Sequence, residues 1–277
     1  MIHIHISARQ RPFELKLREV WEYRHLIRLF TERTFKVSYA QTVLGPLWLF
    51  INPLITAFMY TVVFGNIAGL STDGLPQLLF YLTGNAFWGY FSACLTNNAS
   101  TFTGNAHLFG KVYFPRLTVP ISNVLSACIR FGIQMVPALL LIFYYVLRGV
   151  LAPHWLCWLA LPLLLAELGI MGMGIGILIS SMTIKYRDLS VLVGFGVSLW
   201  MYATPVVYPL STLSGTLRKL SLCNPLTAPV ELFRYALLGT GTILPLGLLY
   251  SVLFTALMIL PGIAVFNRVE RTFMDTV

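Results

Sequence analysis

The amino-acid sequence predicts an all-α integral membrane protein with six transmembrane helices. Two observations predict it: the composition is too apolar for a soluble domain, and the apolar residues gather in long runs. Of the 277 residues, 57% are hydrophobic and only 10% are charged, whereas soluble domains carry about 25% charged residues. A surface with so few charges cannot face water on all sides, so the natural solvent for this chain is a bilayer.

Six apolar runs are long enough to cross the hydrocarbon core, which is about 30 Å thick and needs roughly 18 or more apolar residues. The third run exceeds this need, so we expect it to tilt or to extend beyond the bilayer. Together they form a permease domain at 44–277, preceded by a segment at 1–43. The predicted spans are 44–67, 78–95, 117–147, 155–182, 189–208 and 243–266.

The segment at 1–43 predicts an amphipathic helix. Its apolar residues recur every three or four positions, which places them on one helical face. On another face, charges alternate in sign every four residues and can pair. Such a helix just before a span is typical of an interfacial element; the alternative is a cytoplasmic helix packed on a partner. The apolar face is Phe13, Leu17, Val20, Tyr23, Ile27 and Phe30, and the charges are Glu14, Arg18 and Glu22.

The distribution of Lys and Arg predicts the orientation of the chain. With a cytoplasmic N-terminus, fourteen of the nineteen basic residues lie in inside segments and four in outside segments. Cytoplasmic loops carry the excess of Lys and Arg, so both termini are expected in the cytoplasm. This placement beside the spans also favours membrane lipids over nucleic acid as the partner of the +9 charge.

The stretch between the fifth and sixth spans, 209–242, is too short to cross the bilayer twice as full helices. It is interrupted by Pro225 and Pro229, yet 226–238 keeps helical apolar spacing. The pattern favours short re-entrant or interfacial helices on the outer side, where irregular backbone lies against protein or a water-filled cavity.

Two ionisable residues are predicted deep in the bilayer, Arg130 in the third span and Glu167 in the fourth. An unpaired charge at that depth costs several kcal/mol. One interpretation is a structural ion pair between the two spans. The other is that both residues line a polar path or contact an anionic substrate.

Small residues recur every four positions in the fourth and fifth spans, a spacing that lets helix backbones approach closely. We therefore expect these two spans to pack tightly against each other. The two triplets are Gly172, Gly176 and Ser180, and Ser190, Gly194 and Ser198.

Aromatic residues crowd the second span and the end of the fifth. Many aromatics at span ends form interfacial belts, but aromatic faces also stack on sugar rings and would suit a polysaccharide conduit. The candidate conduit residues are Phe87, Trp88, Phe91, Trp200 and Tyr202.

Two short loops on the cytoplasmic side, 109–116 and 183–188, mix basic and aromatic residues. These loops either carry the basic residues that any cytoplasmic loop carries under the positive-inside rule, or they form a docking surface for a cytoplasmic partner. The candidate residues are Lys111, Tyr113, Phe114 and Arg116, and Lys185, Tyr186, Arg187 and Asp188.

Motifs of bond chemistry are missing from the sequence. No phosphate loop GxxxxGK[ST], HExxH, CxxC or GxSxG occurs. The four cysteines lack metal-ligand spacing. We therefore expect no catalytic residue, metal or cofactor in this chain.

At these residues the sequence resembles a known family, the permease subunits of ABC transporters that export polysaccharides (O-antigen, capsule or teichoic acid). The resemblance runs in order from about residue 13 to 270. It rests on the amphipathic helix and the two loops above, and on four further motifs. These are Leu44-Gly45-Pro46-Leu47-Trp48, Asn52-Pro53, Thr204-Pro205-Val206-Val207-Tyr208-Pro209 and Asn224-Pro225.

The resemblance implies a homodimer in the inner membrane, paired with a separate ATPase subunit that binds ATP and Mg²⁺. The two loops would couple to that ATPase. The cargo would be a glycan on a polyprenyl diphosphate lipid, most often O-antigen for lipopolysaccharide biosynthesis. The lipid diphosphate would meet Arg24, Arg28 and Arg33 of the amphipathic helix.

Three other functions stay open at this point. The cargo of an ABC permease could instead be a drug or another lipid, which neighbouring resistance genes would indicate. An intramembrane glycosyl- or acyltransferase would need clustered acidic or His residues. A passive channel would need a ring of charges.

Overall fold

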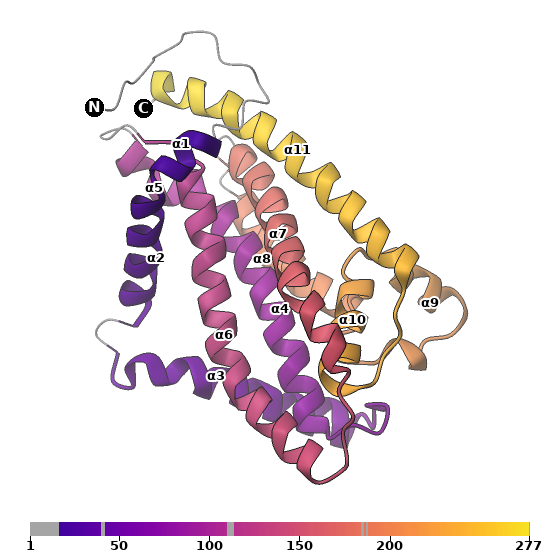
Figure 1. Cartoon of the computed structure of the whole chain (residues 1–277). Coiled ribbons are helices and arrows are strands. Elements are labelled where there is room, and N and C mark those ends of the chain that lie inside the picture. The colour runs from indigo at the N-terminus through magenta and orange to yellow at the C-terminus, as the bar shows by residue number, and fades with distance from the viewer. Residues whose placement is uncertain (1–16, 40–41, 110–113, 184–185, 187, 277) are drawn as a thin grey trace.

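The computed structural model describes residues 17–39, 42–109, 114–183, 186 and 188–276, and within these ranges every regular element is helical (Figure 1). Its longer helices are α1 (Leu17–Glu22), α2 (Arg24–Tyr39), α3 (Trp48–Tyr60), α4 (Gln77–Ala99), α5 (Thr101–Phe109), α6 (Thr118–Leu147), α7 (Leu161–Thr183), α8 (Leu189–Ala203), α9 (Gly215–Leu222), α10 (Thr227–Leu238) and α11 (Pro245–Thr276). Short helical turns flank them at η1 (Gly45–Leu47), η2 (Thr61–Ile67), η3 (Trp155–Ala160) and η4 (Leu210–Thr212).

Among the residues that the structure describes, four helical stretches are both long and apolar enough to cross a bilayer. They are Gly45–Ile67, Thr118–Leu147, Trp155–Thr183 and Pro245–Val269, and they match the first, third, fourth and sixth predicted spans. The fifth predicted span, 189–208, is wrong in extent: α8 has 15 residues, about 22 Å at 1.5 Å per residue. Its helix ends where the chain turns into Thr204-Pro205.

The second predicted span corresponds to α4, which has 23 residues but is too polar to be counted with those four. The reason is its central position, with α3, α6, α7, α8 and α10 packed around it. Two of its buried polar side chains bond to backbone carbonyls one turn earlier in the same helix. Thr83 Oγ1 donates to Leu79 O at 2.9 Å, and Asn98 Nδ2 donates to Cys94 O at 2.7 Å.

The helix α7 lies between α4 and α11, and glycines bring the backbones together on both sides (Figure 1). A Cβ atom on Gly176 would lie 2.6 Å from Leu95 O, and one on Gly172 would lie 2.8 Å from Cys94 Cβ. On the opposite side, a Cβ atom on Gly174 would lie 2.9 Å from Ile259 Cα of α11. These small residues therefore fix the closest helix contacts of the bundle.

The expected packing between the fourth and fifth spans is wrong. The glycines of α7 face α4 and α11, whereas a Cβ atom on Gly194 of α8 would meet nothing within 4 Å. The four-residue spacing marks a close-packing face in α7 but not at Gly194 of α8, and it does not say which helix covers that face.

The amphipathic N-terminal helix is present, broken at Tyr23 into α1 and α2. Val20 and Ile27 of its apolar face are buried. The helix α2 runs along α6 (Figure 1), and the rings of Phe30 and Phe114 lie 5.7 Å apart. The predicted charge pairing occurs at Arg18–Glu22, with 3.7 Å between nitrogen and oxygen.

The region 209–242 forms two short helices, α9 and α10, as predicted. They differ in environment, because α10 is almost entirely buried while α9 is mostly exposed. The helix α10 stops at Gly239, whose φ of +76° favours glycine. A side chain there would also collide with Ala152 O.

The glycine contacts of α7 predict opposite effects for two Gly→Ala changes. Gly176→Ala should destabilise the protein by about 1–3 kcal/mol, because the methyl group overpacks the contact with α4. Gly194→Ala should be neutral or stabilising by up to about 1 kcal/mol, since alanine favours a helix and the space is open. Thermal unfolding in detergent measures both, and equal melting temperatures would contradict the close contact.

Candidate functional site

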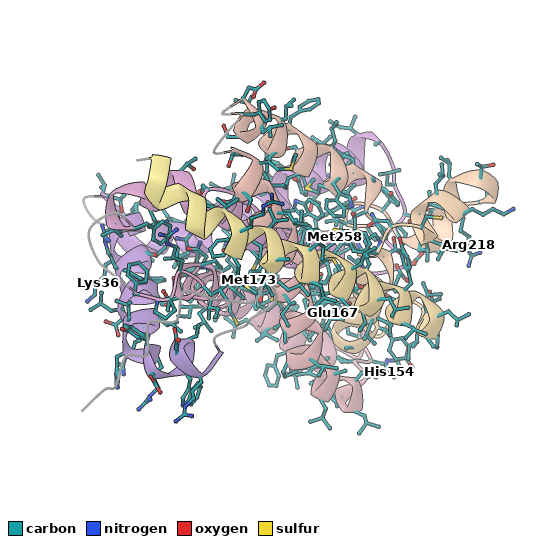
Figure 2. All side chains as sticks on the ribbon, turned by 90° about the horizontal axis from the view of Figure 1, so that it is seen from above. Lys36, His154, Glu167, Met173, Arg218 and Met258 are labelled. Atoms are coloured by element: carbon teal, nitrogen blue, oxygen red, sulfur yellow. The ribbon has the colours of Figure 1, made fainter. Side chains whose placement is uncertain are left out.

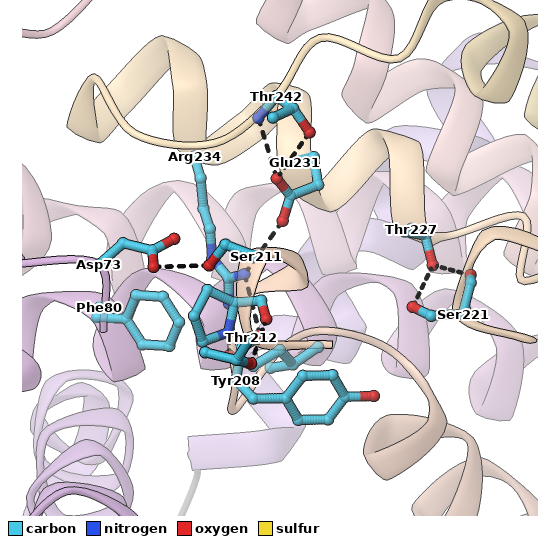
Figure 3. Close-up of polar contacts among 12 residues, drawn as sticks. Asp73, Phe80, Tyr208, Ser211, Thr212, Ser221, Thr227, Glu231, Arg234 and Thr242 are labelled. Atoms are coloured by element: carbon cyan, nitrogen blue, oxygen red, sulfur yellow. Dashed lines mark hydrogen bonds and ion pairs between the residues drawn. The ribbon is translucent and has the colours of Figure 1, made fainter. Parts of the chain in front are cut away.

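A buried arginine organises the end of the bundle where α10 meets α4 (Figure 3). Arg234 of α10 places its guanidinium carbon 4.1 Å from the centroid of the Phe80 ring of α4. Its Nη2 donates to Val206 O at 2.7 Å, and its Nη1 donates to Tyr208 O at 3.4 Å. The segment 204–208, called the strap below, links α8 to the short helices. The Arg234 side chain thus holds this strap against both α10 and α4.

Glu231 completes this cluster from one turn earlier on α10. One carboxylate oxygen lies 3.6 Å from Arg234 Nη1. The other accepts from the backbone N–H of Thr242 at 3.0 Å. Burial lowers the pKa of Arg234 to about 10, an effect that Glu231 opposes, so the arginine stays charged at neutral pH. The pair therefore holds the loop between α10 and α11 as well as the strap.

A further hydrogen bond ties a third segment to the same region. Ser211 Oγ of η4 donates to Asp73 Oδ1 at 2.7 Å (Figure 3). Asp73 lies in the turn before α4, so the loop between α3 and α4 is joined to the strap. Three connections between helices thus converge around α10.

A pocket of about 530 Å³ opens beside this cluster, between the end of α8 and α9. Asn224 shapes it: its Oδ1 accepts from Trp200 Nε1 at 3.2 Å, and its Nδ2 donates to Thr204 Oγ1 at 2.8 Å. Tyr202 and Tyr208 also line the pocket, and Tyr208 donates to Tyr202 O at 3.0 Å. The Asn224 amide is fully bonded within the protein and fixes the wall of the pocket, while the exposed ring of Tyr202 offers a face on which a sugar ring can stack.

The candidate aromatic conduit is brought together only in part. Trp200 and Tyr202 line the pocket, but Phe87, Trp88 and Phe91 lie in the core of the bundle, at most 6% exposed. Their rings pack on neighbours within the chain, for example Phe91 on Trp200 at 5.3 Å. The assignment of these three to a conduit is therefore corrected for this conformation, because the chain's own helices cover them.

The candidate residues of the two coupling loops also differ in exposure. Phe114 and Arg116 are buried, and Arg116 lies over the ring of Phe109 at 5.3 Å, so these side chains support the loop from within. Tyr186 and Asp188 are exposed. The other four candidates, Lys111, Tyr113, Lys185 and Arg187, lie outside the described residues.

The three arginines assigned to the lipid diphosphate are all exposed on α2. Arg28 pairs with Glu32 at 2.9 Å, and Arg24 lies over the ring of Trp21 at 5.9 Å. Arg24 and Arg28 line a groove against α6, and Arg33 does not. Arg33 follows Arg24 by nine positions, about half a turn away around the helix, so the three side chains do not converge on one site.

The predicted ion pair between Arg130 and Glu167 is wrong. Glu167 lies beside α11 (Figure 2) and accepts from Ser251 Oγ of that helix at 2.5 Å. Among the described residues, the ion pairs of 4 Å or less do not include Arg130 with Glu167. The sequence does not fix which face of the helix points to which neighbour: α7 turns Glu167 toward Ser251 of α11 rather than toward α6.

The Glu231–Arg234 pair was missed, since Arg234 counted only as an outside charge. A signal was available: opposite charges three positions apart inside the apolar helical stretch 226–238 are neighbours on one helix face. A buried pair of this kind holds segments in place, and the adjoining pocket can bind a ligand.

Comparison with known protein families gives one match that covers most of the chain. A family model described as ABC-2 type transporter matches residues 25–238. The match contains the helices from α2 to α10, and so includes the strap, the pocket and the buried pair.

Curated proteins also match along the chain. An O-antigen export system permease protein RfbA of Klebsiella pneumoniae is 29% identical over 254 residues, which cover 90% of this chain and 94% of the relative. A second protein of that name and organism is 27% identical over 252 residues, with the same coverage. One from Myxococcus xanthus is 28% identical over 216 residues, covering 76% and 80%.

The buried Glu231–Arg234 pair predicts a large loss of stability when its arginine is removed. Arg234→Gln should lower stability by about 3–5 kcal/mol, because Glu231 then remains buried without its charge partner. Arg218→Gln, on the exposed face of α9 (Figure 2), should change stability by less than about 0.5 kcal/mol. Thermal unfolding in detergent compares the two, and similar melting temperatures would contradict the role of Arg234.

A double-mutant cycle tests the partner of Glu167. Glu167→Gln combined with Ser251→Ala should show a coupling energy of about 1 kcal/mol, as expected for hydrogen-bonded helices in a bilayer. Glu167→Gln combined with Arg130→Gln should be additive within about 0.5 kcal/mol. Coupling only between Glu167 and Arg130 would contradict the contact with Ser251 and support an ion pair between Glu167 and Arg130.

Proposed function

The chain belongs to the ABC-2 type transporter family, and from this premise we propose that it is the membrane permease of an O-antigen exporter. It moves a lipid-linked polysaccharide from the cytoplasmic to the outer side of the inner membrane. The observation that carries the proposal is the similarity to O-antigen export permeases over 90% of the chain and 94% of the relative. Such coverage compares whole permeases rather than a shared fragment.

The proposed topology has six spans, with α4 and α8 added to the four apolar stretches. The polar α4 crosses the bilayer surrounded by other helices, which shield it from contact with lipid. The short α8 reaches the outer side through its strap. Both termini are cytoplasmic, as the excess of basic residues there supports.

The proposed assembly is a homodimer with a separate ATPase subunit that binds ATP and Mg²⁺. A phosphate loop is missing from this sequence, so hydrolysis by that mechanism needs a partner. The loops at 109–116 and 183–188 are the proposed contacts. Tyr186 and Asp188 present exposed side chains to the partner, while Phe114 and Arg116 transmit movement to α2 and α5 through their buried contacts.

The proposed cargo is a glycan on polyprenyl diphosphate. At the cytoplasmic side, the diphosphate meets exposed arginines of α2, with Arg24, Arg28 and Arg33 as the candidates. At the outer side, sugar rings stack in the pocket of Trp200 and Tyr202. ATP binding by the partner displaces the two loops, and the bundle shifts around the polymer without forming or breaking a bond in it.

Depletion of this protein in its native cell tests the function. Long polymer on polyprenyl diphosphate should accumulate on the cytoplasmic side while surface glycan disappears, and the accumulated polymer identifies the cargo. Capsule or teichoic-acid polymer in that pool would replace O-antigen as the cargo. Unchanged surface glycan would refute polysaccharide export and leave a drug or another lipid as the cargo.

Coupling to the ATPase is tested by changing the exposed loop. Tyr186→Ala combined with Arg187→Ala should abolish export while the protein still inserts and unfolds at its normal temperature. Tyr144→Ala serves as the control, because this half-exposed tyrosine lies near the opposite end of α6. Surface glycan and membrane levels are measured for both, and normal export in the double variant would refute the coupling role.

A further inference from the structure

A groove of about 700 Å³ runs between α1–α2 and the first half of α6. Figure 1 shows α2 running alongside α6 at this place. Its walls are apolar: Val20 and Ile27 form one side, and Ile121, Leu125 and Ile129 form the other. Leu125 and Ile129 keep 45% and 47% of their surface exposed, so the part of the chain that the structure describes leaves this apolar wall uncovered.

The groove has the length of one bilayer leaflet or less. Ile121 and Ile129 are eight residues apart, which is about 12 Å along a helix. The 30 residues of α6 extend to about 45 Å, against a hydrocarbon core of about 30 Å. The helix α6 begins at Thr118, directly after the loop 109–116 that is proposed to face the cytoplasm, so its first half starts at the cytoplasmic surface. The groove then lies at the boundary between acyl chains and headgroups.

The rim of the groove is basic. Arg24, Arg28 and Glu32 line it. Glu32 is shared between two cations, Arg28 at 2.9 Å and Lys36 at 3.9 Å, so its charge is offset and the rim keeps a net positive charge. Trp21, 70% exposed, stands beside Arg24, and aromatic residues of this kind favour the headgroup level.

We propose that this groove binds one anionic phospholipid of the surrounding bilayer. An acyl chain covers Ile121, Leu125 and Ile129, and the phosphate accepts hydrogen bonds from Arg24 and Arg28. An apolar wall with basic side chains along its edge matches the acyl chain and the phosphate of such a lipid. A phospholipid chain ends within its own leaflet, as the groove does, whereas a polyprenyl chain is far longer. The bound lipid joins α2 to α6.

This inference refines one part of the proposed function and does not depend on its cargo. It assigns Arg24 and Arg28 to a resident lipid and leaves Arg33, which lies outside the groove, for the transported lipid. A failure of lipid binding would therefore leave the export function standing. Conversely, failure of export in the depletion experiment would not remove the groove.

The test uses the purified protein with its ATPase partner in mild detergent. Phosphatidylglycerol or phosphatidylcholine is titrated while thermal unfolding is followed, and native mass spectrometry identifies retained lipid. Phosphatidylglycerol should stabilise the complex more than phosphatidylcholine does. Arg24→Gln should weaken its apparent affinity about tenfold, the effect of losing one charge-assisted hydrogen bond. Leu125→Trp, which fills the groove, should abolish retention.

Two matched variants serve as controls. Arg18→Gln removes an equally exposed cation of α1 that does not line the groove, and Leu140→Trp enlarges an exposed residue of α6 outside it. Both should respond to phosphatidylglycerol like the unaltered protein. Equal responses to the two lipids, or equal losses in test and control variants, would overturn the proposal. Retention of a polyprenyl diphosphate lipid instead would also overturn it and place the groove on the transport path.

Discussion

The structure depends on the close approach of α7 to α4 on one side and to α11 on the other. In a bilayer the lipid tails are as apolar as leucine, so helices associate through close packing rather than through the hydrophobic effect. Gly172 and Gly176 bring the backbone of α7 onto α4, and Gly174 brings it onto α11. Because no side chain intervenes at these points, the three helices form one frame on which the other segments are mounted.

The polar cluster at one end of the bundle follows from that frame. Phe80 belongs to α4, and the Arg234 guanidinium lies over its ring while donating to the strap after α8. A buried charge pair adds little net stability by itself. Its value is positional, since it selects one arrangement of the strap and of the loop before α11. The exposed α9 and the aromatic pocket therefore lie beside a fixed structure, where movement of α9 can alter the pocket without disturbing the core.

The sequence predicted the fold class and the long apolar helices well, because length and apolarity are local properties. The extent of α8 was missed since the apolar run continues past Thr204-Pro205, where the helix ends. Site residues were harder to predict. Glu167 was paired with Arg130 of α6 but contacts Ser251 of α11, because spacing along one helix does not fix which neighbour covers each face.

The aromatic residues of α4 were assigned to a conduit for the same reason: the sequence does not show which neighbours cover a helix face. Phe87, Trp88 and Phe91 belong to the helix at the centre of the bundle, and a crowd of aromatic residues looks alike whether it lines a path or fills a core. Arg234 was undervalued because its hydrogen bonds go to backbone carbonyls of a distant strap, which carry no side-chain signature. The loop residues, in contrast, were selected from a pattern of charge and aromaticity, and only part of that pattern is exposed.

The measurement that tests the central claim most directly is transport by the purified complex. The protein is reconstituted with its ATPase subunit in proteoliposomes that contain lipid-linked O-antigen. The glycan on each side of the bilayer is then measured with a glycosidase added outside. Export by this permease predicts ATP-dependent movement of the glycan to the protected side, which stops when ATP is replaced by a non-hydrolysable analogue. Hydrolysis of ATP with no change in glycan distribution would contradict the claim.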